Sequence, residues 1–212
     1  MGFEPFGDTR PADTPWPSLV WPVPAGTVLG DGRVELSALD PDRDAAELHA
    51  ALDDDRVWRH LAGRAADPAG LAAVLRERRD HLGWHQWCVR SAVTGQVLGT
   101  TSYLEVSVPD ARLEVGATAY APAVWGTAVN PACKLLVLGH AFEVLRAGRV
   151  QLKTDVRNER SQRAIERLGA RPEGLLRRYQ RRADGTVRDT ALFSVTAEEW
   201  PAVREGLRRR LA

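Results

Sequence analysis

The chain has 212 residues, of which 44% are hydrophobic and 27% charged, a composition that suits one domain with a substantial core. Its 29 Lys and Arg residues almost balance its 28 Asp and Glu residues, which argues against a protein that works mainly by binding nucleic acid or an anionic membrane. Cys88 and Cys133 lie in apolar stretches without metal or redox spacing, so we expect buried reduced thiols. Without a long apolar run or a signal pattern, we expect a soluble cytoplasmic protein.

The first thirty residues are predicted to form an arm. Their proline density excludes a helix interior or a central strand. The prolines are Pro5, Pro11, Pro15, Pro17, Pro22 and Pro24. Trp16 and Trp21 could lay this segment on the surface. We therefore divide the chain into a Pro-rich arm, residues 1–30, and a domain, residues 31–212.

The first half of the domain alternates between helix and strand patterns. A strand is expected at 33–39, then a helix at 40–52 that Asp40 or Asp42 would cap, and a second helix at 67–82. Strand-like runs follow, with a hairpin turn at 93–95 between the first two. These runs are 84–92, 96–106 and 112–121.

The second half continues with a helix after 126–128, whose Leu135, Leu138, Phe142 and Leu145 share one face. Asn158 is a good cap for another helix, and Gly169 is a good left-handed terminator. The remaining expected elements are strands at 149–156, 172–181 and 186–195, and a C-terminal helix beginning within 198–203. This mixed order predicts a single α+β domain.

A small-residue turn, Gly126, Thr127 and Ala128, runs directly into the helix marked by Asn130 and Pro131. A helix start exposes N–H groups without intrahelical partners at the positive end of the dipole, so a phosphate-sized anion would fit there. The turn lacks the Gly-Lys-Ser/Thr of a Walker loop and the third glycine of a dinucleotide fingerprint. From the residues alone, an anion site and an ordinary tight helix start both remain open.

Four stretches extend this observation: "EVGATAYAPAVWGTAVN", "LKTDVRNERSQRAIERLGARPEG", "DGTVRDTALFSV" and "EEWP". Together, in this order, they resemble the GCN5-related N-acetyltransferase (GNAT) superfamily, in particular its branch of ribosomal-protein N-terminal acetyltransferases. The resemblance covers most of residues 33–205. It implies a mixed, mostly antiparallel sheet flanked by helices. It also implies acetyl-CoA as co-substrate and a primary amine as acceptor, such as a protein N-terminus or a small molecule.

The resemblance also implies cofactor contacts. The family's pyrophosphate loop, Arg/Gln-x-x-Gly-x-Gly/Ala, falls on 123–128, with Ala123 in place of the leading Arg or Gln. The residues expected to hold the cofactor are Trp125, Gly126, Thr127, Ala128, Val129, Asn130, Asn158 and Ser161. Asn158 would contact the pantetheine arm, although it could also be only a helix cap. Ser161 would protonate the departing thiolate, because Ile165 stands where much of the superfamily has a tyrosine.

An amine attacks a thioester only when it is neutral, so a base is useful, and an α-amine needs less help than a lysine side chain. Glu114 resembles the branch's proposed base, although an ion-paired strand carboxylate is the competing interpretation. The resemblance places oxyanion-stabilising N–H groups near 117–119.

The acceptor walls are the least recognisable part. By family analogy they include Trp58, Arg177 and Tyr179, although Trp58 is as readily a packing residue. His81 and His85 have helical metal-ligand spacing, but Gly83 interrupts it and we expect no metal. His140 is expected to be a partly buried surface residue.

Several alternatives stay open. Some relatives use succinyl-CoA, whose extra carboxylate an Arg could bind. The chain could instead be a catalytically silent acyl-CoA-binding module. The basic runs 177–182 and 208–210 are expected to be solvated rather than bound to nucleic acid. A homodimer is expected because dimers are common in similar proteins.

Overall fold

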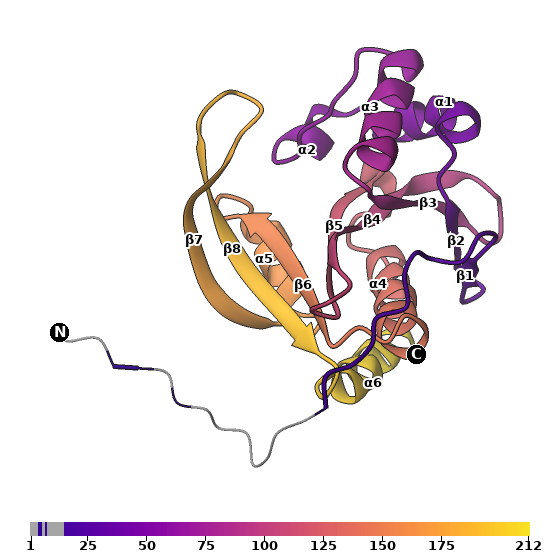
Figure 1. Cartoon of the computed structure of the whole chain (residues 1–212). Coiled ribbons are helices and arrows are strands. Elements are labelled where there is room, and N and C mark those ends of the chain that lie inside the picture. The colour runs from indigo at the N-terminus through magenta and orange to yellow at the C-terminus, as the bar shows by residue number, and fades with distance from the viewer. Residues whose placement is uncertain (1–3, 6, 8–14) are drawn as a thin grey trace.

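The computed structural model describes residues 4–5, 7 and 15–212; the start of the predicted arm, including Pro11, lies outside the described residues. A single eight-stranded sheet runs through the described part in the order β1-β2-β3-β4-β5-β6-β8-β7 (Figure 1). Most neighbouring strands are antiparallel, which confirms the predicted α+β fold. The strands are β1 (Val28–Gly30), β2 (Val34–Ala38), β3 (His85–Ser91), β4 (Val97–Ser107), β5 (Arg112–Tyr120), β6 (Arg149–Asp155), β7 (Arg171–Arg181) and β8 (Val187–Thr196).

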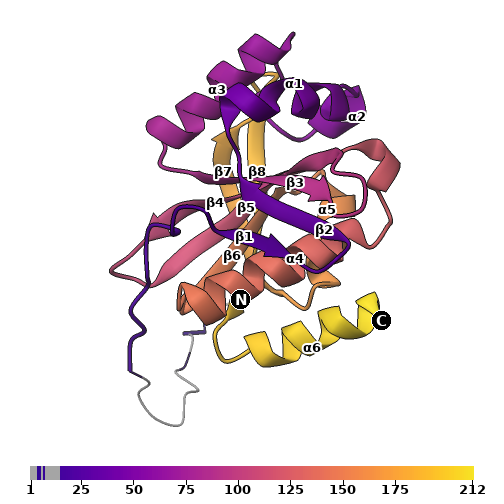
Figure 2. The ribbon, with the colours of Figure 1, turned by 90° about the vertical axis from the view of Figure 1, so that its right-hand side faces the viewer.

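Helices cover both faces of the sheet. Three helices lie above it in Figures 1 and 2, and α4 and α6 lie below it. The upper helices are α1 (Pro41–Leu52), α2 (Asp55–Trp58) and α3 (Pro68–Asp80), and the others are α4 (Val129–Gly139), α5 (Glu159–Glu166) and α6 (Trp200–Leu211). Several starts follow the sequence signals: the Asp40 side chain caps α1 and the Asn158 side chain caps α5.

Two hydrophobic cores separate these layers. The larger core joins the sheet to α4 and α6, and Trp87 and Tyr103 are its largest fully buried side chains. The smaller core lies between the sheet and α1 to α3 and includes Leu48 and Leu75. Both cysteines are buried and free, as expected.

The second half of the predicted arm belongs to the domain rather than only to its surface. Leu19 and Val23 are buried in the larger core, Trp21 packs against it, and β1 pairs with β2 as the first strand of the sheet. The expectation for His140 was wrong, because this residue is only 5% exposed. Its ring lies next to Trp87 and Tyr103 in an aromatic cluster whose members come from three separate elements.

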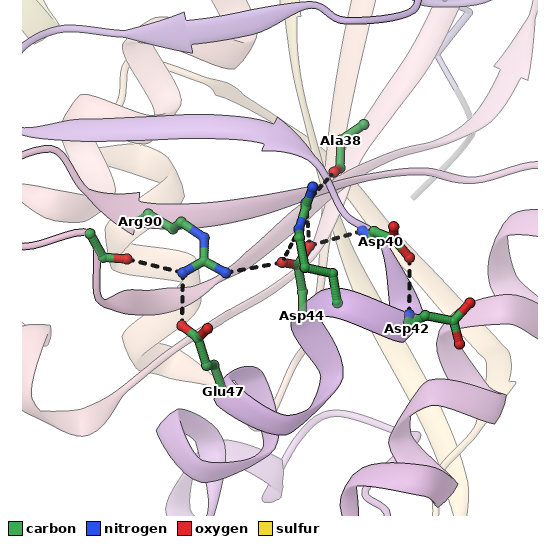
Figure 3. Close-up of polar contacts among 8 residues, drawn as sticks. Ala38, Asp40, Asp42, Asp44, Glu47 and Arg90 are labelled. Carbon is green, nitrogen blue, oxygen red and sulfur yellow. Dashed lines mark hydrogen bonds and ion pairs between the residues drawn. The ribbon is translucent and has the colours of Figure 1, made fainter.

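An ion network around the buried Asp44 fixes α1 against the sheet (Figure 3). Asp44 is fully buried, accepts a hydrogen bond from Asp40 N at 2.9 Å, and pairs with Arg43 at 2.7 Å and Arg90 at 3.0 Å. Burial alone would raise the pKa of Asp44, but these hydrogen bonds hold it below its ordinary value. Arg90 also pairs with Glu47 at 2.7 Å, so the start of α1 is tied to β3.

Candidate active site

The sheet divides between β5 and β6, its one parallel pair among the described strands. They pair only from Arg112 to Glu114 on β5 and from Arg149 to Gln151 on β6. Beyond that point β5 continues beside β4, whereas β6 continues beside β8. The two strands therefore diverge, and the region between their separated ends is called the opening below. The chain leaving β5 leads to the start of α4, and the chain leaving β6 leads to the start of α5, so two helix N-termini face this region.

The loop before α4 presents free backbone donors. Gly126, Thr127 and Ala128 are exposed, and the N–H groups of Gly126, Ala128 and Asn130 donate to no acceptor among the described residues. Gly126 adopts φ of 77°, a conformation that favours glycine, and a Cβ there would meet nothing within 4 Å. The predicted anion site therefore has accessible donors.

The other loop positions have structural partners. The Thr127 hydroxyl donates to Val124 O at 2.7 Å and accepts from Val129 N at 3.3 Å. Thr127 thus shapes the turn, and the Val129 N–H is already used. The Trp125 indole donates to Tyr120 O at 2.9 Å, which fastens the loop to the end of β5.

Two guanidinium groups flank Trp125. Arg160, from the start of α5, lies 4.0 Å from the ring centroid, and Arg56, from α2, lies 5.5 Å from it. Arg160 forms no ion pair with a described carboxylate. These cations lie beside the donor loop, where Ala123 fails to supply the positive or polar side chain that the family pattern expects. Arg56 is already paired with Asp54 at 2.7 Å, so Arg160 is the one of the two that adds positive charge beside the exposed N–H groups.

Asn158 and Ser161 lie at the start of α5. The Asn158 Oδ1 accepts from Ser161 N at 3.1 Å, so the cap interpretation is correct, and a contact to a cofactor would use the remaining amide group. The Ser161 side chain is partly exposed. Ile165 is only 7% exposed and packs in the larger core, so no side chain from that position reaches the opening.

A bulge in β5 coincides with the place where the strands separate. The register between β4 and β5 shifts between Thr100 and Ser102, and Ala117 has φ of 48°. A buried amine lies beneath this bulge: Lys134 of α4 donates to Thr118 Oγ1 at 2.9 Å and to Thr101 Oγ1 at 3.3 Å. Burial lowers the pKa of Lys134 to about 8. The bulge therefore has a specific polar support.

Glu114 belongs to a compact charge cluster at the base of the opening. Its Oε2 lies 2.8 Å from Lys153 Nζ and accepts from Gln151 Nε2 at 3.2 Å. Lys153 also pairs with Glu105 at 2.6 Å. Burial raises the pKa of Glu114, and the hydrogen bond and charge of Lys153 oppose this rise. Its second oxygen lies over Gly116, where an added Cβ would come within 2.7 Å of it.

The three residues expected to line the acceptor site lie in different surroundings. Trp58 is partly buried in the smaller core, and its indole donates to Leu52 O at 2.8 Å. Tyr179 on β7 is 42% exposed, and its hydroxyl accepts from Lys153 at 3.1 Å, so it does adjoin the Glu114 cluster. Arg177 is exposed. Of the three, Tyr179 alone contacts a residue of that cluster through its side chain.

Comparison with known proteins decides the family. A family model of the acetyltransferase (GNAT) domain matches residues 33–171. The chain belongs to the GNAT acetyltransferases. A solved structure of a putative acetyltransferase from T. thermophilus shares 38% sequence identity with this acetyltransferase and superposes with a TM-score of 0.82, covering 91% of this chain and 100% of that one.

Two further relatives place the acetyltransferase among known folds. It is 24% identical to the uncharacterized N-acetyltransferase YoaA of Bacillus subtilis (strain 168) over 73% of this chain and 88% of that protein. The Mycobacterium smegmatis RimJ structure, solved in complex with CoA-disulfide, has the same fold, with a TM-score of 0.72 at 22% identity, covering 87% of this chain and 94% of that one.

Sequence reasoning missed several residues of this acetyltransferase that surround the opening. Lys153, Lys134 and Arg160 approach it from β6, α4 and α5 respectively. One sequence signal was available, because the chain has only two lysines. In the structure, both lysine side chains are buried and contact polar groups.

Among the described helices, none combines the length and the apolar composition that a membrane span requires.

Proposed function

We propose that this chain transfers an acetyl group from acetyl-CoA to a primary amine by direct attack while both substrates are bound. The observation that carries the proposal is the set of accessible N–H groups at Gly126, Ala128 and Asn130, at the head of the opening between β5 and β6. Such donors at a helix start suit a pyrophosphate. The complex of RimJ with a CoA-disulfide supports CoA as the ligand class.

The residues have distinct proposed roles. The loop from Trp125 to Asn130 holds the pyrophosphate, and Asn158 holds the pantetheine arm. The amine nitrogen attacks the thioester carbon, and N–H groups near 117–119 stabilise the oxyanion that develops. The carbon–sulfur bond then breaks, Ser161 protonates the thiolate, and Glu114 accepts the proton that the amine loses. Amine attack on a thioester needs no metal.

Glu114 must remain ionised to act as a base. Lys153 favours the charged form, whereas burial favours the neutral form, and the second effect is larger because the pKa lies above its ordinary value. A carboxylate whose pKa is raised is a better proton acceptor than an exposed glutamate. An α-amine, with a reference pKa of about 8, needs only modest assistance, which is why a protein N-terminus is the acceptor we favour.

The test combines binding and turnover. The purified chain is incubated with acetyl-CoA and a panel of peptide N-termini and small amines, while thiol release and acetylated product are measured. We expect turnover on at least one α-amine. CoA binding by calorimetry without turnover on any amine would instead favour a silent acyl-CoA-binding module. Absence of CoA binding would refute the loop assignment.

A further inference from the structure

Two buried donors on β8 have no partner among the residues that the structure describes. The Arg188 Nε and the Thr190 Oγ1 are both buried and form no hydrogen bond within the described part of the chain. Thr190 is fully buried. The two residues are two positions apart on one strand, so their side chains leave the same face of the sheet. Two adjacent unsatisfied polar groups are unusual, because buried polar groups almost always have partners.

The strand register places these donors on the face that carries the Glu114 cluster. Thr190 lies opposite Asp155, Leu192 lies opposite Lys153, and Gln151 lies opposite Glu114 on its other side. The residues from Gln151 to Asp155 span roughly 13 Å at about 3.3 Å per residue. About 13 Å of strand therefore separates the level of Glu114 from the level of Thr190 along the sheet.

The local carboxylates do not explain Arg188. Asp155 already binds Arg182 at 2.6 Å and accepts from Arg157 N at 2.9 Å, and the Arg182 hydrogen bond lowers the pKa of Asp155 to about 2. Desolvation lowers the pKa of Arg188. The charges of Asp155 and Glu114 oppose this lowering, but neither carboxylate forms an ion pair with Arg188 in the described part of the chain. A partly buried guanidinium without an anion costs free energy in the folded state.

The chemistry of the two donors identifies what fits them. A guanidinium has only donors and prefers planar carboxylates, and a neighbouring hydroxyl can donate to the same ligand. We propose that Arg188 and Thr190 bind a carboxylate of the substrate in the acceptor half of the site. This inference rests on the proposed function and narrows its substrate class. The carboxylate belongs either to the acyl group, as in succinyl-CoA, or to the amine acceptor, as in an amino acid.

Two pairs of substrates distinguish these sources. Acetyl-CoA and succinyl-CoA are compared with phenethylamine as acceptor, and phenylalanine and phenethylamine are compared with acetyl-CoA as donor. In one of these pairs the wild type should prefer the carboxylate-bearing member in kcat/KM by about 10- to 100-fold, the range for a charge-assisted hydrogen bond. Arg188→Gln should remove the preference, and Thr190→Val should reduce it by several-fold.

Arg181→Gln is the matched control. Arg181 is exposed and pairs with Val187, next to the position of Arg188, so its side chain leaves the opposite face. This variant should keep the wild-type preference. Arg188→Gln should not lower the melting temperature, because it removes a charge that has no ion-pair partner among the described residues. A clear loss of stability would indicate a structural role instead.

Other outcomes overturn the inference or separate it from the proposed function. Equal kcat/KM within both pairs for the wild type, or an unchanged preference in Arg188→Gln, overturns the carboxylate site. If no substrate pair turns over, the proposed function fails. The carboxylate site is then tested by calorimetry with succinyl-CoA, acetyl-CoA, N-acetylphenylalanine and N-acetylphenethylamine. Tighter binding of a carboxylate-bearing ligand that Arg188→Gln abolishes supports the site, and equal affinities overturn it.

Discussion

Removal of Lys153 tests both the stability and the chemistry of the Glu114 cluster. The side chains of Lys153 and Glu114 are 4% and 6% exposed and lie 2.8 Å apart. In Lys153→Met, Glu114 would stay buried without its cation and would still lie near Glu105. Breaking a buried pair in this way costs about 3–5 kcal/mol. At roughly 2–4 °C per kcal/mol for a chain of this size, the melting temperature at pH 7 should fall by about 6–20 °C.

The pH dependence of this loss has a defined sign. The pKa of Glu114 is already raised in the folded state, and without Lys153 it should rise further. The cost is therefore complete above the folded pKa and disappears as the pH falls to the pKa of an unfolded glutamate, about 4.3. Urea unfolding at pH 7 and pH 5 should show a smaller deficit at pH 5. Lys153→Met/Glu114→Gln should recover most of the stability, with Glu114→Gln alone as the matched control.

The same variant separates structural from chemical roles. If Glu114 is the base, the acidic limb of the kcat/KM profile should move to higher pH in Lys153→Met. A stability loss without that movement would remove Glu114 as the base. Unchanged stability at pH 7 would show that the ion pair does not hold Glu114, and the reasoning above would fail.

Three other substitutions test separate parts of the site. Gly126→Glu should abolish CoA binding by charge repulsion at the donor loop. Gly126→Ala should weaken CoA binding only through backbone strain at positive φ. If calorimetry finds equal CoA affinity for Gly126→Glu and the wild type, the loop assignment is contradicted. Ser161→Ala should slow acyl transfer in single-turnover measurements with little change in CoA affinity, and an unaltered rate dismisses it as the acid. Because burial lowers the pKa of Lys134 to about 8, this side chain binds more protons in the unfolded chain than in the folded one from there to about pH 10.4, so the Lys134 contribution to stability should rise by about 3 kcal/mol over that interval. Lys134→Met should lack this rise in urea unfolding, and identical slopes would show that Lys134 is not buried as described.

Local signals predicted most elements in their order and several of their ends, but they did not predict β1 or α2. Asn158 caps its helix, Gly169 adopts φ of 95°, and Gly126 adopts φ of 77°, because capping and positive φ depend on residues close in the chain. The donor loop was predictable for the same reason. The resemblance added the expectation that this loop binds the pyrophosphate of acetyl-CoA, a point that the residues alone left open.

Contacts between distant strands were not predictable. The pairing of Lys153 with Glu114 depends on β6 lying beside β5, and the position of Thr190 opposite Asp155 depends on β8 lying beside β6. That strand order differs from chain order, and period-2 patterns do not encode it. His140 was misplaced because a single histidine gives no periodic signal about the aromatic rings that surround it.

The opening between β5 and β6 has an evolutionary consequence. It arises where two backbones stop pairing after three residues, so the divergence of the strands is a property of the backbone rather than of one side chain. Under the proposed function, mutations on β6 and β8 can therefore change which amine or acyl group is accepted while the divergence of the two strands persists. With a scaffold of this kind, substrate selectivity can diverge among related proteins while the arrangement of the strands stays the same.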